Sequence, residues 1–364
     1  GIVDAVDLHR YEVADGMRRV CARILADYPF ANGYADIKAC VGAIARSLRD
    51  RLQHRHASGL QSIELIPVPF FRERRAYLVG RAVSERGHLP VVIALVSTPQ
   101  GVMADAVLTE VEQLSQLFSY ARSYFHADLP TVADIVVFLS ALMPHKPIDE
   151  LFTLLGRVKQ GKTERYRHLF RHLQRHADER LVRADGARGM VMAVFTPRDY
   201  PLVFKVIRDR FAYPKDIGRR QVEEKYRLVF RHDRIGRLLD AQEFRHLHFR
   251  RDQFDADMLE ELLGECAEAV SVQDDQVLVR HCYVQRRLRP MNLFVREASA
   301  ADALRAMLDY GQSIKDLARS NVFPGDLLLK NFGISRGGRA IFYDYDELCL
   351  LDDCRFRSLP EARE

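Results

Sequence analysis

NVFPGDLLLKNFGISRGGRAIFYDYDEL, residues 321–348, is the stretch that decides the fold. In it Asp326 precedes Asn331 by five residues, and a Gly-Gly turn and a short apolar strand then lead into Asp344 and Asp346. Phosphoryl transfer needs little covalent help from a protein, but it needs a carboxylate to orient the attacking hydroxyl and oxygen ligands for a divalent cation. This segment carries side chains of both kinds.

The same spacing also fits an ordinary loop with a capping aspartate, followed by a hairpin with exposed carboxylates. Lys205 favours the functional interpretation, because it lies within the apolar run VFKVI and follows a glycine-containing turn. A lysine in such a run is by itself usually a surface residue of an edge strand. Protein kinases, however, combine a strand lysine with an aspartate, an asparagine five residues later and a second aspartate. The combination predicts a kinase-type phosphotransfer domain.

The chain of 364 residues is long enough for about two domains. Apolar spacing predicts helices in the first half at residues 17–30, 37–52 and 107–125. Two β-branched stretches, residues 62–71 and 90–96, predict a small sheet together with AYLVGRAV between them. The second half predicts a β-hairpin and a further strand alternating with helices, at residues 190–195, 202–207, 221–230, 258–269 and 277–288. The predicted fold class is α+β.

The amino-acid composition limits the kinds of partner, metal site and cellular compartment that are expected. The 55 Lys and Arg exceed the 50 Asp and Glu by only five, so no nucleic-acid partner is expected. The six cysteines form no CxxC pair, which argues against a zinc site and favours a reducing compartment. No apolar run approaches the roughly twenty residues that span a bilayer, and GIVDAVDLHR does not resemble a signal peptide. We expect a cytoplasmic protein with no membrane partner.

Longer segments resemble the bacterial isocitrate dehydrogenase kinase/phosphatase family. They are GARGMVMAVFTPRDYPLVFKVIRD, YRLVFRHDRIGRLLDAQEF, YVQRRLRPMNL and NVFPGDLLLKNFGISRGGRAIFYDYDE, and FSYARSYF in the first half also fits. The resemblance covers most of the chain and is strongest after residue 184. It implies a mainly helical regulatory domain with a small sheet at residues 1–180. A bilobal kinase-like domain would follow at 181–364, with a small lobe at 181–284 and a truncated large lobe from 285.

The resemblance also implies roles for the candidate residues. Asp326 would orient the substrate serine, Asn331 and Asp344 would hold the metal ion, and Asp346 would support that site. The cofactor-binding residues would be Ala184, Asp185, Gly186, Ala187, Arg188, Gly189, Met190 and Lys205.

Two assignments do not follow from the residues themselves. Asp240 is implied as a catalytic residue, especially in the phosphatase direction, only by the resemblance. From the sequence alone it fits equally well a helix N-cap, with Glu243 completing a capping box. The acidic partner of Lys205 is also open, because Glu223 and Glu224 on the next predicted helix are equal candidates.

A family member would phosphorylate and dephosphorylate NADP-dependent isocitrate dehydrogenase, and thereby control the glyoxylate bypass against the citric acid cycle. Its cofactors would be ATP, or ADP in the phosphatase direction, with Mg²⁺ or Mn²⁺, and AMP would act as an allosteric effector. The N-terminal helices and the C-terminal helical region of the family are missing from this sequence. The oligomeric state is open, and a homodimer is one candidate.

Two positions depart from the family pattern. Leu308 and Asp309 stand where an acidic pair is expected, and Gln285 stands where the family usually has glutamate. Two other classes of function are alternatives: a pseudokinase-like module that binds nucleotide without transferring phosphate, and a small-molecule kinase with the same lobes.

Overall fold

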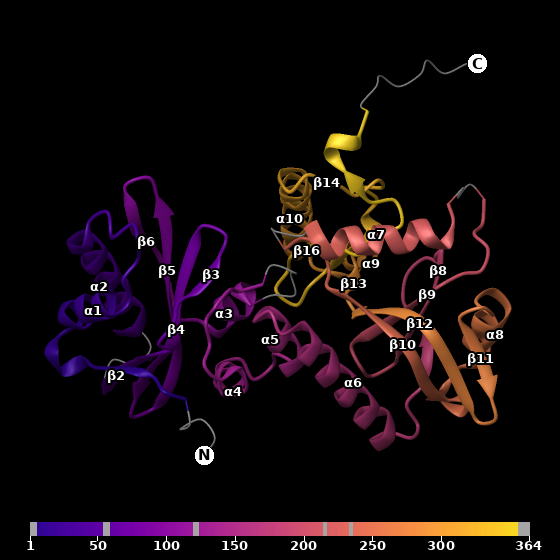
Figure 1. Ribbon diagram of the computed structural model, residues 1–364, viewed down its shortest axis with the longest axis horizontal. Coiled ribbons are helices and arrows are strands. Elements are labelled where there is room, and N and C mark those ends of the chain that lie inside the picture. The colour runs from indigo at the N-terminus through magenta and orange to yellow at the C-terminus, as the bar shows by residue number, and fades with distance from the viewer. Residues whose placement is uncertain (1–5, 54–58, 119–123, 214–216, 233–235, 356–364) are drawn as a thin grey trace. The chain divides into compact units, whose positions relative to one another are not determined.

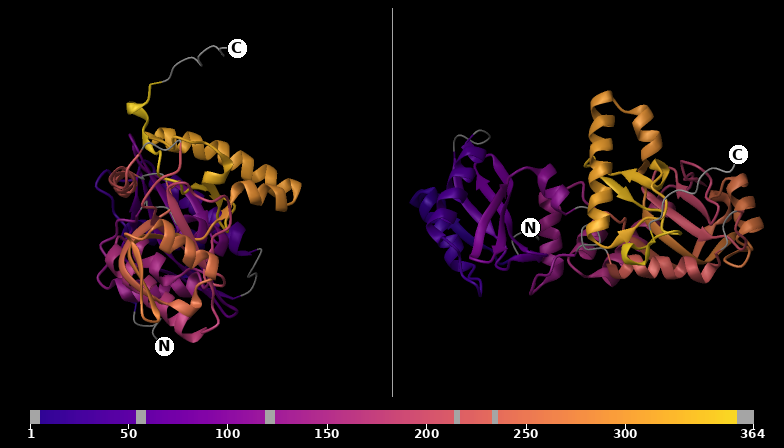
Figure 2. Two further views of the ribbon diagram at one scale, coloured as in Figure 1. Left: turned by 90° about the vertical axis from the view of Figure 1, so that its right-hand side faces the viewer. Right: turned by 90° about the horizontal axis from the view of Figure 1, so that it is seen from above.

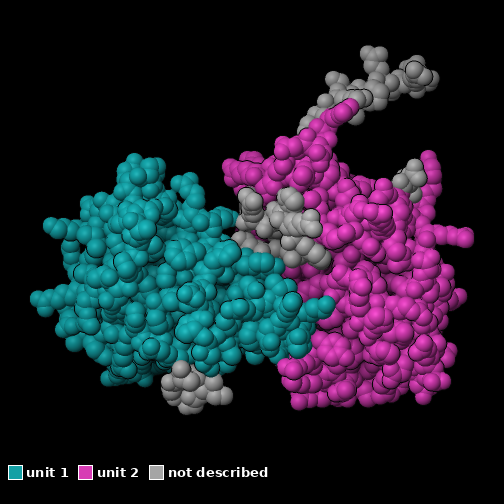
Figure 3. Space-filling model, in the orientation of Figure 1, with its two compact units in different colours: residues 1–119, 123–165 teal, residues 120–122, 166–364 magenta. Residues whose placement is uncertain are grey.

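The computed structural model describes residues 6–53, 59–118, 124–213, 217–232 and 236–355. The chain divides into two compact units, which Figure 3 shows in different colours. Unit 1 covers residues 1–119 and 123–165, and unit 2 covers residues 120–122 and 166–364. The division falls within one helix, α6 (Val158–Arg175). A domain boundary after residue 180 stays a prediction.

Unit 1 is built on a six-stranded antiparallel sheet, larger than the stretches predicted from sequence (Figure 1). Its strand order is β1-β2-β4-β5-β6, and β3 pairs with β4. The strands are β1 (His9–Glu12), β2 (Leu60–Leu65), β3 (Phe70–Arg72), β4 (Arg75–Ser84), β5 (Gly87–Thr98) and β6 (Gly101–Leu108). The middle strands β4 and β5 are buried on both faces, because helices cover each side of the sheet.

Successive side chains of a strand point to opposite faces of the sheet, and the helices of unit 1 pack against both faces. Leu78 and Ile93 lie in one core with α1 (Met17–Asp27) and α2 (Ile37–Gln53). Val79 and Val92 lie in a second core with the other helices. Those are α3 (Val111–Leu117), α4 (Val132–Leu142) and α5 (Ile148–Leu154).

The predicted bounds of one helix in unit 1 were wrong. The helical pattern predicted for residues 107–125 begins inside β6, which continues to Leu108, and α3 ends at Leu117. Pairing of β6 with β5 prevails over the helical spacing there. Most of FSYARSYF lies outside the described residues.

Unit 2 contains a second six-stranded antiparallel sheet, of order β10-β12-β9-β8-β7, with β11 paired to β12. Its strands are β7 (Leu181–Arg183), β8 (Met192–Pro197), β9 (Leu202–Ile207), β10 (Ala241–Arg250), β11 (Val270–Gln273) and β12 (Gln276–Arg286). The predicted hairpin is confirmed by β8 and β9. Helix α8 (Ala256–Glu265) packs with the core of phenylalanines on one face, and α7 (Arg219–His232) packs with a separate core.

The rest of unit 2 is mostly short strands and two helices that lie side by side (Figure 2). Ser299 caps the longer helix, α10, by accepting a hydrogen bond from the backbone N–H of Asp302 at 3.1 Å. The elements are β13 (Arg289–Pro290), α9 (Met291–Glu297), α10 (Ala300–Arg319), β14 (Val322–Phe323), β15 (Phe332–Ile334), β16 (Ala340–Phe342) and β17 (Cys349–Leu350). Three-residue 3-10 helices occur in unit 1 at η2 (Val13–Asp15), and in unit 2 at η3 (Arg251–Gln253), η4 (Leu329–Asn331) and η5 (Leu351–Asp353).

No helix in the described ranges is both long enough and apolar enough to cross a membrane. The alternative placement of Asp240 at a helix N-cap is wrong. The residues after it, Ala241–Arg250, form strand β10, and Glu243 pairs across the sheet with Tyr283.

Candidate active site

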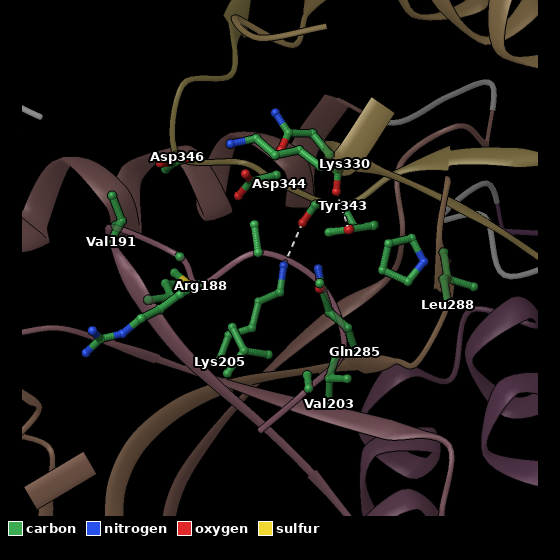
Figure 4. Close-up of a pocket in the computed structure, with 18 of the residues that line it drawn as sticks. Arg188, Val191, Val203, Lys205, Gln285, Leu288, Lys330, Tyr343, Asp344 and Asp346 are labelled. Carbon is green, nitrogen blue, oxygen red and sulfur yellow. Dashed lines mark hydrogen bonds between the residues drawn. The ribbon is translucent and has the colours of Figure 1, made fainter. Parts of the chain in front are cut away.

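A cavity of about 370 Å³ lies in unit 2 between the sheet and the segment that follows β14. It is lined by Asp326, Asn331, Asp344, Asp346, Lys205 and all seven residues of the predicted loop, Ala184, Asp185, Gly186, Ala187, Arg188, Gly189 and Met190. Figure 4 shows Asp344 and Lys330 on one side of the cavity and Lys205, Val203 and Gln285 projecting from the other. The structure therefore brings together side chains that are up to about 160 positions apart in the sequence.

The loop at residues 184–190 joins β7 to β8 in a tight turn. Gly186 has a φ of 112°, a conformation that L side chains rarely adopt. A Cβ on Gly189 would lie 2.7 Å from the backbone carbonyl oxygen of Met192. Both glycines are thus required by the backbone path of this loop.

Arg188 in this loop is held by helix α8. Its Nε donates to Glu261 at 3.2 Å, and its guanidinium also pairs with Glu265. Glu261 is buried and binds Arg208 and Arg183 as well. The guanidinium groups hold the pKa of Glu261 below its usual value, although burial opposes them. An arginine network therefore fixes the loop to α8.

Lys205 points from β9 into the cavity and is only 6% exposed. Its Nζ donates to the backbone carbonyl oxygen of Tyr343 at 2.7 Å and lies 5.0 Å from the centre of the Tyr343 ring. Burial lowers the pKa of Lys205 to about 8, and the negative charges of Asp344 and Asp346 oppose that shift. These aspartates are its acidic neighbours, whereas Glu224 binds Arg220 on the outside of α7.

Asp326 and Asn331 are positioned by a hydrogen-bonded turn. Asp326 Oδ1 accepts a hydrogen bond from the backbone N–H of Leu328 at 2.9 Å, and Asn331 Nδ2 donates to the Asp326 carbonyl oxygen at 3.4 Å. Gly325 has a φ of 84°, and a Cβ there would lie 2.6 Å from Glu347. The glycine lets the chain pass closely beside the segment that carries the other aspartates.

Asp344 and Asp346 follow the β15–β16 hairpin. The backbone N–H of Tyr343 donates to the Asn331 carbonyl oxygen at 3.1 Å, which ties the two cavity-lining segments together. Tyr345 is fully buried between the two aspartates, and its ring packs edge-on against Tyr226 at 5.2 Å. Burial of this tyrosine leaves the carboxylates before and after it at the cavity wall.

The donors at this wall suit a hard divalent cation. Two carboxylates and one amide oxygen are the ligand types that Mg²⁺ and Mn²⁺ prefer, and Mg²⁺ usually takes only one or two protein carboxylates besides water and phosphate. Within the described residues, no cluster of three or more His, Cys, Asp or Glu side chains could hold a metal. The carboxylate and amide ligands at the wall fit a cation that a phosphate ligand also binds.

Asp240 is not among the residues that line the cavity, although its neighbour Leu239 is. Asp240 is buried at the start of β10. The backbone N–H of Leu239 donates to the Phe342 carbonyl oxygen at 3.0 Å, so Asp240 lies close along the chain to the strand that leads to Asp344. Its catalytic role stays a prediction.

Sequence reasoning missed several charged residues of the cavity. Arg208, Glu261 and Lys330 line it. Arg208 directly follows the apolar strand β9, which could have indicated a buried cation, but nothing in the sequence pointed to its partner on α8.

Residues 4–364 match models of one family. Residues 4–178 match the isocitrate dehydrogenase kinase/phosphatase (AceK) regulatory domain, and residues 179–364 match the kinase domain of the same family. Among solved structures, a ROP18 kinase domain in complex with AMP-PNP and sucrose is 13% identical, and the match covers 50% of this chain and 61% of that chain. Its TM-score of 0.28 is too low to support an argument about the fold.

Curated relatives carry the same family name. The isocitrate dehydrogenase kinase/phosphatase of Xanthomonas campestris pv. campestris (strain 8004) is 58% identical over 353 residues, which are 97% of this chain and 61% of that protein. That of Anaeromyxobacter sp. (strain Fw109-5) is 45% identical over 362 residues, which are 99% of this chain and 62% of that protein. This chain spans about three fifths of the length of these relatives. It belongs to the isocitrate dehydrogenase kinase/phosphatase family.

Proposed function

We propose that this protein is an ATP-dependent, bifunctional Ser/Thr protein kinase and phosphatase acting on NADP-dependent isocitrate dehydrogenase. The observation that carries the proposal is the meeting of Lys205, Asp326, Asn331 and Asp344 around one cavity. The family membership supports the substrate, because the curated relatives are named for it. The reaction would control the glyoxylate bypass against the citric acid cycle in the cytoplasm.

Position and charge support the proposed role of each residue. Asp326 would accept the hydrogen bond of the substrate serine hydroxyl and take its proton. Lys205 is a buried cation, and it would bind the negatively charged phosphates of ATP. Asn331 and Asp344, supported by Asp346, would hold Mg²⁺ or Mn²⁺, which neutralises charge on the transferring phosphoryl group.

The phosphatase direction would use the same cavity with bound ADP. Either direction needs neutralised charge on a phosphoryl group, so one set of residues can serve both. We place Asp240 in this direction because the family resemblance implies it; Asp240 lies beside the strand that leads to Asp344 and does not itself line the cavity. The sheet domain of unit 1 would be the regulatory domain that binds AMP.

The test is transfer of labelled γ-phosphate from Mg-ATP to purified NADP-dependent isocitrate dehydrogenase by the intact protein. We expect label on a dehydrogenase serine with parallel loss of dehydrogenase activity, and a loss of at least about 100-fold in rate for Asp326→Ala. The matched control is Asp252→Ala, an exposed aspartate paired with Arg250, which should leave transfer unchanged.

Three results would contradict the proposal. Unaltered transfer in Asp326→Ala would remove its proposed role. Tight binding of Mg-ATP without any transfer would favour a pseudokinase-like regulatory module. Transfer to a choline-like or sugar acceptor, but not to the dehydrogenase, would favour a small-molecule kinase.

A further inference from the structure

Gln285 is a buried polar side chain whose amide has no hydrogen-bond partner among the described residues. It lies at the end of β12, is 0% exposed and lines the cavity. Neither its Oε1 nor its Nε2 is hydrogen-bonded within the described structure. A buried amide in this state is destabilising, because each unpaired donor or acceptor has lost its hydrogen bonds to water. A ligand that fills the cavity could supply the missing partners.

The strand register shows where this amide points. Tyr283 lies opposite Lys205, and Gln285 lies opposite Val203, in the antiparallel pairing of β12 with β9. Residues two apart on a strand share a face, so Gln285, Val203 and Lys205 share the face toward the cavity. Figure 4 shows the three side chains directed into the same space.

The surroundings of Gln285 differ from those of the phosphate-binding end. Apolar side chains from four segments line the cavity with it: Val194, Val203, Leu239 and Leu288. Asp344 and Lys330 lie on the other side of the cavity (Figure 4). Apolar walls with a few placed polar groups are the usual environment for a flat heteroaromatic ring.

We propose that Gln285 determines which nucleobase the cavity accepts, by hydrogen-bonding the edge of adenine with its buried amide. Its Oε1 would accept from the exocyclic amine, and its Nε2 would donate to the neighbouring ring nitrogen. A glutamine amide matches this adjacent donor and acceptor of adenine, whereas a carboxylate could only accept. The proposal rests on the proposed function, since it requires that a nucleotide occupies the cavity.

The chain contains a matched control in the adjacent strand. Gln242 is also buried, and neither of its amide atoms has a hydrogen-bond partner among the described residues. It lies next to Ala241, the residue opposite Gln285, and so faces the other side of the sheet, as Phe244 does. Gln242 does not line the cavity. It therefore shares the burial of Gln285 but not its access to a ligand.

The experiment compares ADP with purine riboside diphosphate, which lacks the exocyclic amine, by isothermal titration calorimetry. The intact wild-type protein should bind ADP roughly tenfold more tightly, a difference of about 1.4 kcal/mol. In Gln285→Met, which keeps the side-chain length without the amide, this preference should fall below about twofold. Gln242→Met should keep the tenfold preference. Thermal melting of each free protein reports whether it is folded.

The outcomes separate this inference from the proposed function. If wild type binds ADP but does not discriminate, or if Gln285→Met keeps the full preference, Gln285 does not recognise the base and the proposed function stands. If Gln285→Met does not fold, the wild-type comparison still decides, since a ratio near one overturns the proposal. If wild type binds neither nucleotide, the proposed function fails and this assignment fails with it.

Discussion

The affinity of the cavity for a nucleoside polyphosphate is expected to fall as the pH rises above 8. The cause is Lys205, whose pKa burial lowers to about 8 from an ordinary value of 10.5. Phosphate groups placed beside Lys205 favour its charged form and so raise its pKa in the complex. Binding therefore takes up a proton whenever Lys205 is neutral in the free protein, and affinity is lost as the pH rises through 8.

The size of the effect follows from this pKa. With a pKa of about 8 in the free protein, Lys205 is charged in roughly three quarters of molecules at pH 7.5 and in about 3% at pH 9.5. If the complex keeps Lys205 charged throughout, the dissociation constant for ADP rises roughly 25-fold over this range. A lysine with an ordinary pKa would give a change of less than about 1.2-fold.

The assay is calorimetric titration with metal-free ADP from pH 7.5 to 9.5, where the terminal phosphate is already ionised. Lys205→Arg serves as the matched control, because its guanidinium stays charged over the whole range and its affinity should not vary. A flat wild-type profile would refute the depressed pKa. An equal loss of affinity in Lys205→Arg would assign the pH dependence to another group.

Two further predictions concern stability. The Arg237 side chain is 4% exposed and binds Asp309 at 2.6 Å, so Arg237→Met should lower the free energy of unfolding by about 2–4 kcal/mol in urea titrations. The control Arg245→Ala breaks an exposed ion pair and should change the free energy of unfolding by less than about 0.5 kcal/mol. Equal losses in the two variants would contradict the argument. A Cβ on Gly80 would lie 1.9 Å from a carbonyl oxygen of β2, so Gly80→Ala should destabilise unit 1 by about 1–3 kcal/mol. Gly42→Ala in helix α2 meets nothing closer than 4.0 Å and should be neutral or stabilising in the same thermal melts; a destabilising result there would refute the steric account.

Local patterns predicted the parts of the fold that depend on neighbouring residues. The run LVFKVI predicted residues 202–207 as a strand, and β9 has those bounds, because every residue of it is buried in the sheet. The spacing of Asp326 and Asn331 also predicted their proximity, since both belong to one short turn. The larger sheet of unit 1 was harder to predict, because β1 and β6 are edge strands whose polar residues interrupt the apolar pattern.

Contacts between distant segments could not be predicted. The hydrogen bond of Lys205 with the Tyr343 carbonyl oxygen joins residues 138 positions apart. The ion pair of Arg208 with Glu261 joins two elements that no local pattern connects. The sequence left Glu223 and Glu224 as equal candidates for the partner of Lys205, since either could lie near it on a helix. Their placement depends on how α7 packs against the sheet, which local propensity does not determine.

The unliganded cavity combines two unfavourable burials on one face of the same sheet. Lys205 has a lowered pKa because burial removes water from its ammonium group, and the Gln285 amide has no partner in the part of the chain that the structure describes. Selection for folding alone would favour apolar side chains at both positions, as their neighbours Val203 and Val194 show. A nucleotide would offset both costs at once, with phosphates beside the lysine and a base edge beside the glutamine. Binding should therefore stabilise unit 2 by more than its contact area alone would indicate, because it also supplies partners for the Gln285 amide and negative charge beside the buried Lys205.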